Sequence, residues 1–398
     1  RPAVRIARSG CDIMTRLTGK RTDDPPLNVD AAVRERYSQA ATRKESALCC
    51  PIAYDEAHLE LVPEEIRERD YGCGDPSRYV FPGEAVLDLG SGGGKICYIA
   101  AQIVGSAGKV IGVDCNDEML ALARKYRSEM ARKLGYDVVE FRKGQIQDLG
   151  LDLELVDAYL AENPVRNSDD WRRFDEQVAL LRRESPLVAD DSIDVIVSNC
   201  VLNLVRPDDR RQLFGEMARV LKRGGRAVIS DIVADEEVPS NLQNDPRLWS
   251  GCISGACRED AFLTAFEEAG FYGIEVIARQ EEPWAVVEGI EFRSVTVRAW
   301  HGKEGPCLER RQAVVYNGPW KAVVDDDGHK LLRGQRMAVC DKTFQIYSRP
   351  PYAGQCTLIA PFEEVPPEEA GPFSCNGPAL RSTRETEGRR DDLAVIQE

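Results

Sequence analysis

The chain has 398 residues, of which 43% are hydrophobic and 30% are charged, and its formal net charge is -15. This length and composition indicate a globular protein with a catalytic domain and one smaller module. No apolar run approaches the ~20 residues that a membrane-spanning helix needs, and the negative charge repels phosphate backbones. We therefore expect neither a membrane nor a nucleic acid as a partner, and we expect a monomer.

The thirteen cysteines do not have the pattern of a secreted disulfide scaffold. Such scaffolds are short chains with small cores, whereas this chain is long enough to bury a large one. The count is odd, and the sequence contains neither a CxxC pair nor a secretory hydrophobic segment. We therefore expect reduced thiols in the cytoplasm, some of them acting as ligands.

The N-terminal region is basic and then helical. The first 21 residues hold six Lys or Arg against one acidic residue, which predicts a flexible basic segment over 1–27; a trimmed targeting segment is the alternative. From about Val29 to Arg69 the apolar spacing is helical, and it leads into Tyr71-Gly-Cys73-Gly. This region is a lead-in to the sheet that follows.

Strands and helices then alternate in the order of a parallel sheet. The predicted strands are Ala85–Leu89, Gly108–Asp114, Val138–Lys143, Ile193–Ser198 and Arg226–Asp231, and the predicted helices are Lys95–Val104, Asp117–Leu134 and Asp208–Leu221. This alternation is typical of a doubly wound α/β sheet of the Rossmann-like class. We expect one domain over 28–287, with a charged helical insertion at 151–186 over one face of the sheet.

Beyond residue 287 the hydrophobic period changes to two. Apolar and polar residues alternate at Phe292–Trp300 and Arg311–Tyr316, which predicts a β-rich C-terminal module over 288–360. The proline, glycine and charge content of 361–398 predicts a disordered tail.

A glycine turn follows the first predicted strand, in the run Asp88-Leu-Gly90-Ser-Gly92-Gly-Gly94-Lys95. The dinucleotide fingerprint requires a glycine at the sixth position of the turn, which here is Lys95. The DxGxGxG pattern is instead that of sheets that bind S-adenosylmethionine, where glycines without a Cβ let the backbone approach the ligand.

An acidic residue at the end of the second predicted strand supports this assignment. Asp114 can accept hydrogen bonds from both ribose hydroxyls. Met119 could pack against the adenine, although ordinary helix packing explains it equally well. Cys115 belongs to this site by its position after Asp114. The complete predicted cofactor site is Asp88, Gly90, Ser91, Gly92, Gly94, Asp114, Cys115, Met119, Gln145, Ile146 and Asn199.

Three cysteines occur where sheet geometry places chemistry. Cys200 follows the fourth predicted strand and Cys252 follows the loop after the fifth, at the carboxyl edge where open α/β sheets bind ligands. Cys73 stands between glycines before the first strand, so a helical lid could bring it to the same crevice. Three soft thiolates would suit a thiophilic ion that accepts three ligands and keeps a lone pair.

At these residues the sequence resembles the arsenite S-adenosylmethionine methyltransferase family. The resemblance extends over about Tyr71 to Tyr316, and its motifs occur in the family's order: YGCG, LDLGSGGG, VSNCVLNLV, RVLKRGG, SDI, LWSGC, SGA, FRSVTVRAW and QAVVYNG. It implies arsenic(III) bound by Cys73, Cys200 and Cys252, methylated at the expense of S-adenosylmethionine, as an arsenic detoxification reaction. It also implies a redox role for Cys49 or Cys50, with thioredoxin or glutathione as the thiol reductant.

Two departures from the family leave other substrates open. The family's GGA is usually followed by an aromatic pair, whereas here Ala256 is followed by Cys257-Arg258, and the insertion at 151–186 is longer than in animal members. A methylated arsenical, an organoarsenical, antimony or a small organic molecule is the alternative acceptor. A thiol-based metalloid-binding protein without turnover is the alternative from another class.

The other cysteines carry no such context. A free cysteine commonly behaves as a small buried hydrophobic side chain. We expect this role for the thiols of Cys97, Cys115, Cys307, Cys340, Cys356 and Cys375.

Overall fold

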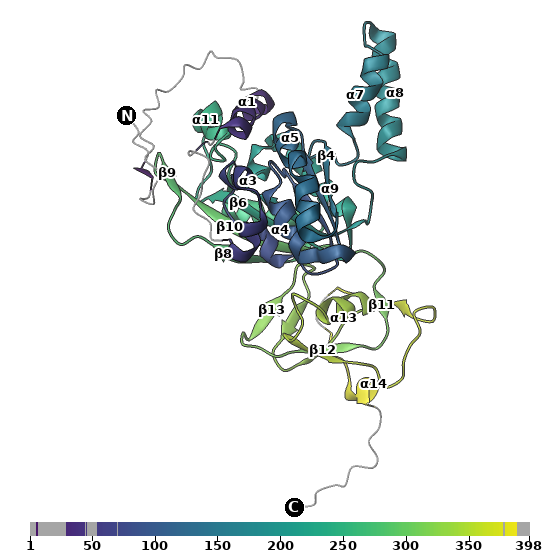
Figure 1. Cartoon of the computed structure of the whole chain (residues 1–398). Coiled ribbons are helices and arrows are strands. Elements are labelled where there is room, and N and C mark those ends of the chain that lie inside the picture. Colours follow the sequence, from purple (N-terminus) through teal and green to yellow (C-terminus); the bar gives the residue numbers. More distant parts are fainter. Residues whose placement is uncertain are drawn as a thin grey trace, which may run out of the picture. The chain divides into compact units, whose positions relative to one another are not determined.

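The computed structural model describes residues 5–6, 29–43, 45, 54–69, 71–376 and 379–387. The chain divides into two compact units, residues 1–301 and 302–398 (Figure 1). Among the described residues, no helix has both the length and the apolar character needed to cross a bilayer.

The first unit is built on one mixed sheet. Its main path runs β1-β9-β10-β6-β5-β2-β3-β4, while β7 pairs with β6 and β8 pairs with β10. The strands are β1 Arg5–Ile6, β2 Ala85–Leu89, β3 Lys109–Asp114, β4 Val139–Lys143, β5 Ile193–Asn199, β6 Leu221–Ala234, β7 Cys257–Arg258, β8 Tyr272–Arg279, β9 Ala285–Val287 and β10 Ile290–Trp300. The five predicted strands are β2 to β6, and they pair in parallel as expected. The predicted α/β Rossmann-like fold class is confirmed.

The central strands are apolar because helices cover both faces of the sheet. Val195, Ile196 and Val197 of β5 are fully buried, as are Val86 and Leu87 of β2. The helices are α2 Glu56–Leu61, α3 Glu64–Glu68, α4 Lys95–Val104, α5 Asp117–Lys125, α6 Arg127–Leu134, α9 Pro207–Val220, α10 Ser240–Gln243, α11 Pro246–Trp249 and α12 Glu259–Glu268. The sequence predicted α5 and α6 as one helix, but the structure breaks it at Tyr126, which caps both.

Helix α1, Val29–Thr42, contacts both α5 and α11. It therefore connects the segment after β3 with the segment after β6. Through these contacts the N-terminal region reaches the site described below.

The insertion forms two helices, α7 Leu153–Glu162 and α8 Ser168–Glu184, which lie side by side and project from the sheet (Figure 1). Tyr159 packs against Phe174 between them. Val156 and Val178 are the buried residues of the pair, one in each helix. The helices are as predicted, but most of their residues are exposed, so they cover little of the sheet's face.

Strand β10 corrects the predicted domain boundary. The sequence assigned Phe292–Trp300 to the C-terminal module, whereas β10 pairs antiparallel with β6, from Phe292 opposite Ala234 to Trp300 opposite Arg226. Alternation predicted the strand correctly but could not identify its partner, because pairing partners are set by tertiary packing. The first unit therefore extends to residue 301.

The second unit is β-rich, as predicted, and its described part includes most of the predicted tail. Its elements are β11 Leu308–Glu309, β12 Ala313–Tyr316, β13 Ala322–Val324, β14 Lys330–Leu332, β15 Arg336–Ala338, α13 Asp341–Tyr347, β16 Cys356–Ile359, β17 Gly371–Pro372 and α14 Thr383–Glu387. β17 pairs with β11, and the buried Arg381 side chain bonds Glu309 at 2.8 Å. The prediction of disorder from 361 is wrong for 361–376 and 379–387, because these contacts order a composition that is also typical of tight turns.

Candidate functional site

The glycine turn after β2 lies directly against the segment that carries Cys200. The N–H groups of Gly90 and Ser91 both donate to the Val113 carbonyl of β3, at 2.8 and 3.0 Å. Gly90 has φ +71°, and a Cβ there would lie 2.4 Å from a Val201 methyl group. Only glycine allows this approach, so the turn and the residue after Cys200 are in contact.

Asp114 ends β3 and organises the turn. Its two oxygens accept hydrogen bonds from the Gly92 N–H at 2.9 Å and from the Asn116 N–H at 2.8 Å. Burial raises the pKa of the Asp114 carboxyl, and these N–H groups partly offset that effect. Each oxygen of a carboxylate can accept more than one bond, so Asp114 keeps capacity for two hydroxyl groups.

The turn fits S-adenosylmethionine. The Ser91 hydroxyl is buried and makes no hydrogen bond within the described structure. Met119 is buried beside the turn, with its sulfur 4.0 Å from where a Gly92 Cβ would stand. A carboxylate with free acceptor capacity, an unpaired hydroxyl and an apolar side chain suit a nucleoside with a polar tail.

The remaining predicted cofactor residues include both buried and exposed side chains. Asp88 is buried and accepts a hydrogen bond from the Cys97 thiol at 3.2 Å. Ile146 is buried in the core under the sheet, whereas Gln145 and Cys115 are exposed. Gly94, with φ +87°, caps the start of α4.

Asn199 connects the first cysteine to the sheet. Its Oδ1 accepts hydrogen bonds from the N–H groups of Cys73 and Gly74, at 2.8 and 3.0 Å. Its Nδ2 donates to the Gly74 carbonyl and to the Tyr54 hydroxyl, at 2.7 and 3.0 Å. These four bonds use the full capacity of the amide, so we place Asn199 with the cysteine site, although the sequence assigned it to the cofactor.

The backbone is strained at the other two predicted ligands. Cys200 has φ +64° and Cys252 has φ +61°, in the left-handed region that non-glycine residues seldom adopt. Such a conformation costs of order 1–3 kcal/mol and persists only where the surroundings impose it. The Cys200 N–H donates to the Ser230 carbonyl at 2.7 Å, which is one such constraint.

The structure brings the three predicted cysteines together. The sulfurs of Cys73 and Cys200 and a carboxylate oxygen of Asp231 lie within 4.8 Å of one another. The Cys252 thiol donates to the Cys200 carbonyl at 3.2 Å. Hydrogen bonds with Cys252 and Cys73, together with burial, raise the pKa of the Cys200 thiol well above its usual range, and burial raises the pKa of Cys73.

Asp231 is the residue that our sequence analysis did not assign. It is fully buried, and burial raises the pKa of its carboxyl to about 6. Its Oδ1 accepts hydrogen bonds from Asn203 Nδ2 and the Ile232 N–H, both at 2.8 Å. The SDI motif contains this residue, and its position at the end of the fifth predicted strand was the available signal.

Helix α1 contributes Tyr37 to a pocket beside the cysteines. A pocket is lined by Tyr37, Tyr71, Gly72, Cys200, Ile232, Gly251, Cys252 and Trp284. Tyr37 and Tyr71 also pack against the small buried cluster of Ala40, Ala41 and Met119. Arg36 Nη1 anchors the helix by donating to the Arg247 carbonyl and the Ser250 hydroxyl, both at 2.9 Å.

Cys49 and Cys50 lie outside the described residues. Their predicted redox role therefore stays a prediction.

Two family models match this chain. A methyltransferase domain matches residues 81–183 and 173–270, and a domain of unknown function (DUF8838) matches residues 303–391. The two matches correspond to the sheet of the first unit and to the second unit.

Similar proteins are arsenite methyltransferases. The chain is 31% identical to the arsenite methyltransferase of Aquipseudomonas alcaligenes, over 81% of this chain and 88% of that protein. It is 30% identical to the human arsenite methyltransferase, over 79% of this chain and 76% of that protein.

One solved structure is also similar to this chain. The arsenic(III) S-adenosylmethionine methyltransferase of Chlamydomonas reinhardtii is 26% identical, with a TM-score of 0.50 over 82% of this chain and all of that one. The chain belongs to the arsenite methyltransferase family and is an S-adenosylmethionine-dependent methyltransferase.

Proposed function

We propose that this enzyme transfers a methyl group to trivalent arsenic bound by the thiolates of Cys73, Cys200 and Cys252. The supporting observation is the contact between Gly90 of the glycine turn and Val201, the residue after Cys200. Because of this contact, the acceptor site and the donor site are neighbours. Residues Asp114, Ser91 and Met119 would hold S-adenosylmethionine, which supplies a methyl group on a positively charged sulfur.

Arsenite binding is a ligand exchange at the three thiols. Each cysteine gives a sulfur–arsenic bond, and its proton leaves with one hydroxyl of arsenite as water. The exchange consumes three thiols and releases three waters without a net proton. The raised pKa of Cys200 is compatible with this step, because the proton departs with the leaving hydroxyl and not to solvent.

The arsenic lone pair then points away from its three sulfur ligands and can attack the methyl carbon in line. Such attack needs the reacting atoms about 3–3.5 Å apart and water excluded. Tyr37 and Tyr71, which line the pocket together with Cys200 and Cys252, would exclude water from the acceptor.

Methyl transfer moves a positive charge onto arsenic. The Asp231 carboxylate lies within 4.8 Å of two of the ligand sulfurs, where that charge develops. A buried fixed charge stabilises a developing opposite charge far more than solvent would. We therefore propose that ionised Asp231 lowers the barrier to transfer.

The methylated arsenic is formally pentavalent. Its return to the trivalent state requires two electrons, which two of the bound thiolates supply by forming a disulfide, while a water takes their place on arsenic and loses a proton. A thiol reductant such as glutathione or thioredoxin then reduces that disulfide. Cys49 or Cys50 would take part by exchange with it. We propose that the enzyme works in a reducing compartment such as the cytoplasm, where its cysteines stay reduced.

The test is to incubate the full chain with S-adenosylmethionine, arsenite and a thiol reductant, and to identify products by mass spectrometry. The proposal requires methylated arsenicals that disappear in Cys200→Ser. An unmethylated arsenic pool, alongside intact cofactor binding, would contradict it.

A further inference from the structure

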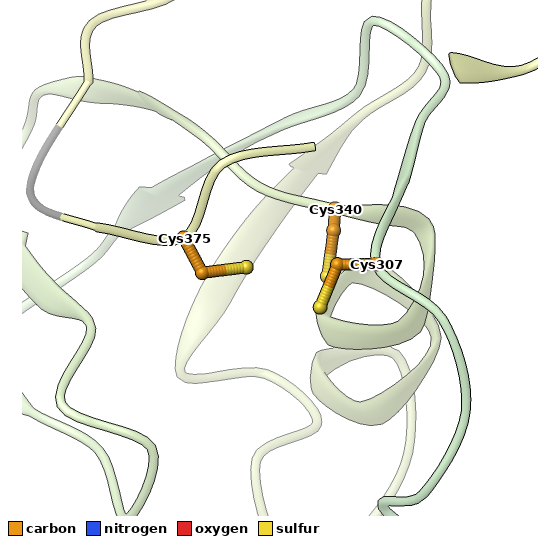
Figure 2. Close-up of side chains that lie close together, drawn as sticks. All are labelled: Cys307, Cys340 and Cys375. Carbon is orange, nitrogen blue, oxygen red and sulfur yellow. The ribbon is translucent and has the colours of Figure 1, made fainter. Parts of the chain in front are cut away.

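A second group of three cysteines lies in the second unit. The sulfurs of Cys307, Cys340 and Cys375 are within 4.8 Å of one another, and Figure 2 shows the three side chains gathered from separate segments. Cys307 precedes β11, Cys340 caps α13 and Cys375 follows β17. All three are free thiols. Our sequence analysis treated them as unrelated packing residues.

Backbone pairing fixes the first and third cysteines beside each other. Leu308 of β11 pairs with Pro372 of β17, and the Phe373 N–H donates to the Cys307 carbonyl at 2.8 Å. The paired segments therefore end at Cys307 on one strand and two residues before Cys375 on the other.

Side-chain bonds hold the residue next to the second cysteine against the segment that follows β11. Asp341, next to Cys340, accepts hydrogen bonds from Arg310 at 2.8 Å and from Gln312 at 3.0 Å. The half-buried Arg310 guanidinium also donates to the Val365 carbonyl at 2.7 Å. The cluster is therefore held by backbone pairing on one side and by side-chain hydrogen bonds on the other.

The environment suits sulfur ligands. Cys340 is fully buried, whereas Cys307 and Cys375 are half-buried, so an ion could enter from one side. The Thr343 N–H donates to the Cys340 sulfur at 3.4 Å, and the Thr343 hydroxyl lies 3.2 Å from it. Such bonds would stabilise a thiolate.

The number of ligands narrows the choice of ion. Among the residues that the structure describes, no histidine, carboxylate or fourth cysteine joins the group. Structural zinc almost always has four protein ligands. A soft ion that accepts three thiolates and keeps a lone pair needs no fourth ligand.

We propose that Cys307, Cys340 and Cys375 form a second binding site for trivalent arsenic, separate from the methylation site. Binding is the same exchange, in which three thiol protons leave with three hydroxyls of arsenite as water. The described residues of the second unit include no DxGxGxG turn that would hold S-adenosylmethionine. We therefore expect this site to bind arsenite without methylating it. It does not depend on the function proposed for the first unit.

Alkylation of the unmodified full chain tests this without any variant. The chain is treated with N-ethylmaleimide in the presence and absence of arsenite, and each cysteine is followed by peptide mass spectrometry. Arsenite should slow alkylation of Cys307 and Cys375 by about tenfold or more, which corresponds to about 1.4 kcal/mol of protection. Cys356, a half-buried cysteine of the same unit outside the cluster, should react at an unchanged rate.

Cys200 reports on the first site in the same experiment. Protection of Cys200 with none at Cys307 or Cys375 would overturn the second site and leave the proposed function standing. Protection of Cys307 and Cys375 alone would support the second site and count against the first.

Arsenic content gives the matching measurement. A chain with Cys73→Ser, Cys200→Ser and Cys252→Ser should still retain one arsenic after gel filtration. Adding Cys375→Ser should remove it, whereas adding Cys356→Ser should not. Retention in the Cys375→Ser chain would overturn the proposal, as would stoichiometric zinc that arsenite cannot displace.

Discussion

The two cysteine clusters of this chain have the same ligand count and different surroundings. Around Cys73 and Cys200 the structure provides a buried carboxylate, strained backbone and a neighbouring glycine turn. Around Cys307, Cys340 and Cys375 it provides ordinary strand pairing and a helix cap. Three thiols suffice to bind a soft ion. Chemistry on that ion additionally requires an aligned donor and a charge placed where the transition state needs it.

The largest effect should follow removal of one ligand of the first cluster. Cys200→Ser should lower the rate of arsenite methylation on the order of 1000-fold, because the acceptor loses its fixed orientation. Affinity for S-adenosylmethionine, measured by calorimetry, should stay within about twofold, since the cofactor contacts are elsewhere. Full activity would refute the ligand assignment, and Cys356→Ser is the matched control.

The next largest effect concerns the carboxylate that distinguishes the clusters. Asp231→Asn should lower kcat by roughly 100-fold, the typical effect of removing one preorganised electrostatic group. Arsenite should still bind with three sulfurs, as X-ray absorption at the arsenic edge would show. An unchanged kcat would reduce Asp231 to a structural role.

Asp231 also predicts a pH dependence. Because burial raises the pKa of its carboxyl to about 6, the group is neutral below that pH and charged above it. The wild-type kcat/KM for arsenite should therefore rise as the pH increases through about 6 and then level off, since this ratio reports ionisation of the free enzyme. Asp231→Asn should lack that rise, and the same rise in the variant would assign it to another group.

A smaller effect should be confined to the donor half of the site. Asp114→Ala removes a charged hydrogen-bond acceptor, and a loss of about 2 kcal/mol, within the range of about 1.5–3 kcal/mol for such a bond, should lower S-adenosylmethionine affinity by roughly 30-fold. Arsenite affinity should persist. Equal cofactor affinity by calorimetry would contradict the role given to Asp114.

The smallest effect tests the anchoring of α1. Arg36→Ala removes the two bonds to Arg247 and Ser250 and should raise the KM for arsenite about fivefold, with kcat less affected. The exposed Glu35 of the same helix provides the control, Glu35→Ala, which should leave both constants unchanged. If Arg36→Ala and Glu35→Ala had the same KM and kcat, the anchoring of α1 would have no role in arsenite binding.

The sequence predicts the parallel sheet well, because strand, glycine turn and helix occur in a fixed order with clear apolar runs. It does not predict the antiparallel edge, since the alternation of Phe292–Trp300 is compatible with any partner. The same limit explains the second cluster: Cys307, Cys340 and Cys375 are far apart along the chain, and only tertiary pairing brings them together.

At the first site, too, the sequence predicts some features and does not predict others. Motif context identified Cys73, Cys200 and Cys252, but a motif does not reveal burial, which gives Asp231 its raised pKa. Asn199 was predicted to bind the cofactor. Its hydrogen bonds to Cys73 and Gly74 depend on a segment more than one hundred residues earlier in the chain.

A crystal structure of the chain soaked with arsenite and S-adenosylhomocysteine would test the central claim most directly. We expect arsenic bonded to the sulfurs of Cys73, Cys200 and Cys252, with its open side facing the cofactor sulfur across the space of one methyl group. Arsenic bound elsewhere, or bound to these sulfurs with its open side turned from the cofactor, would contradict the proposal that these cysteines present the acceptor to the donor.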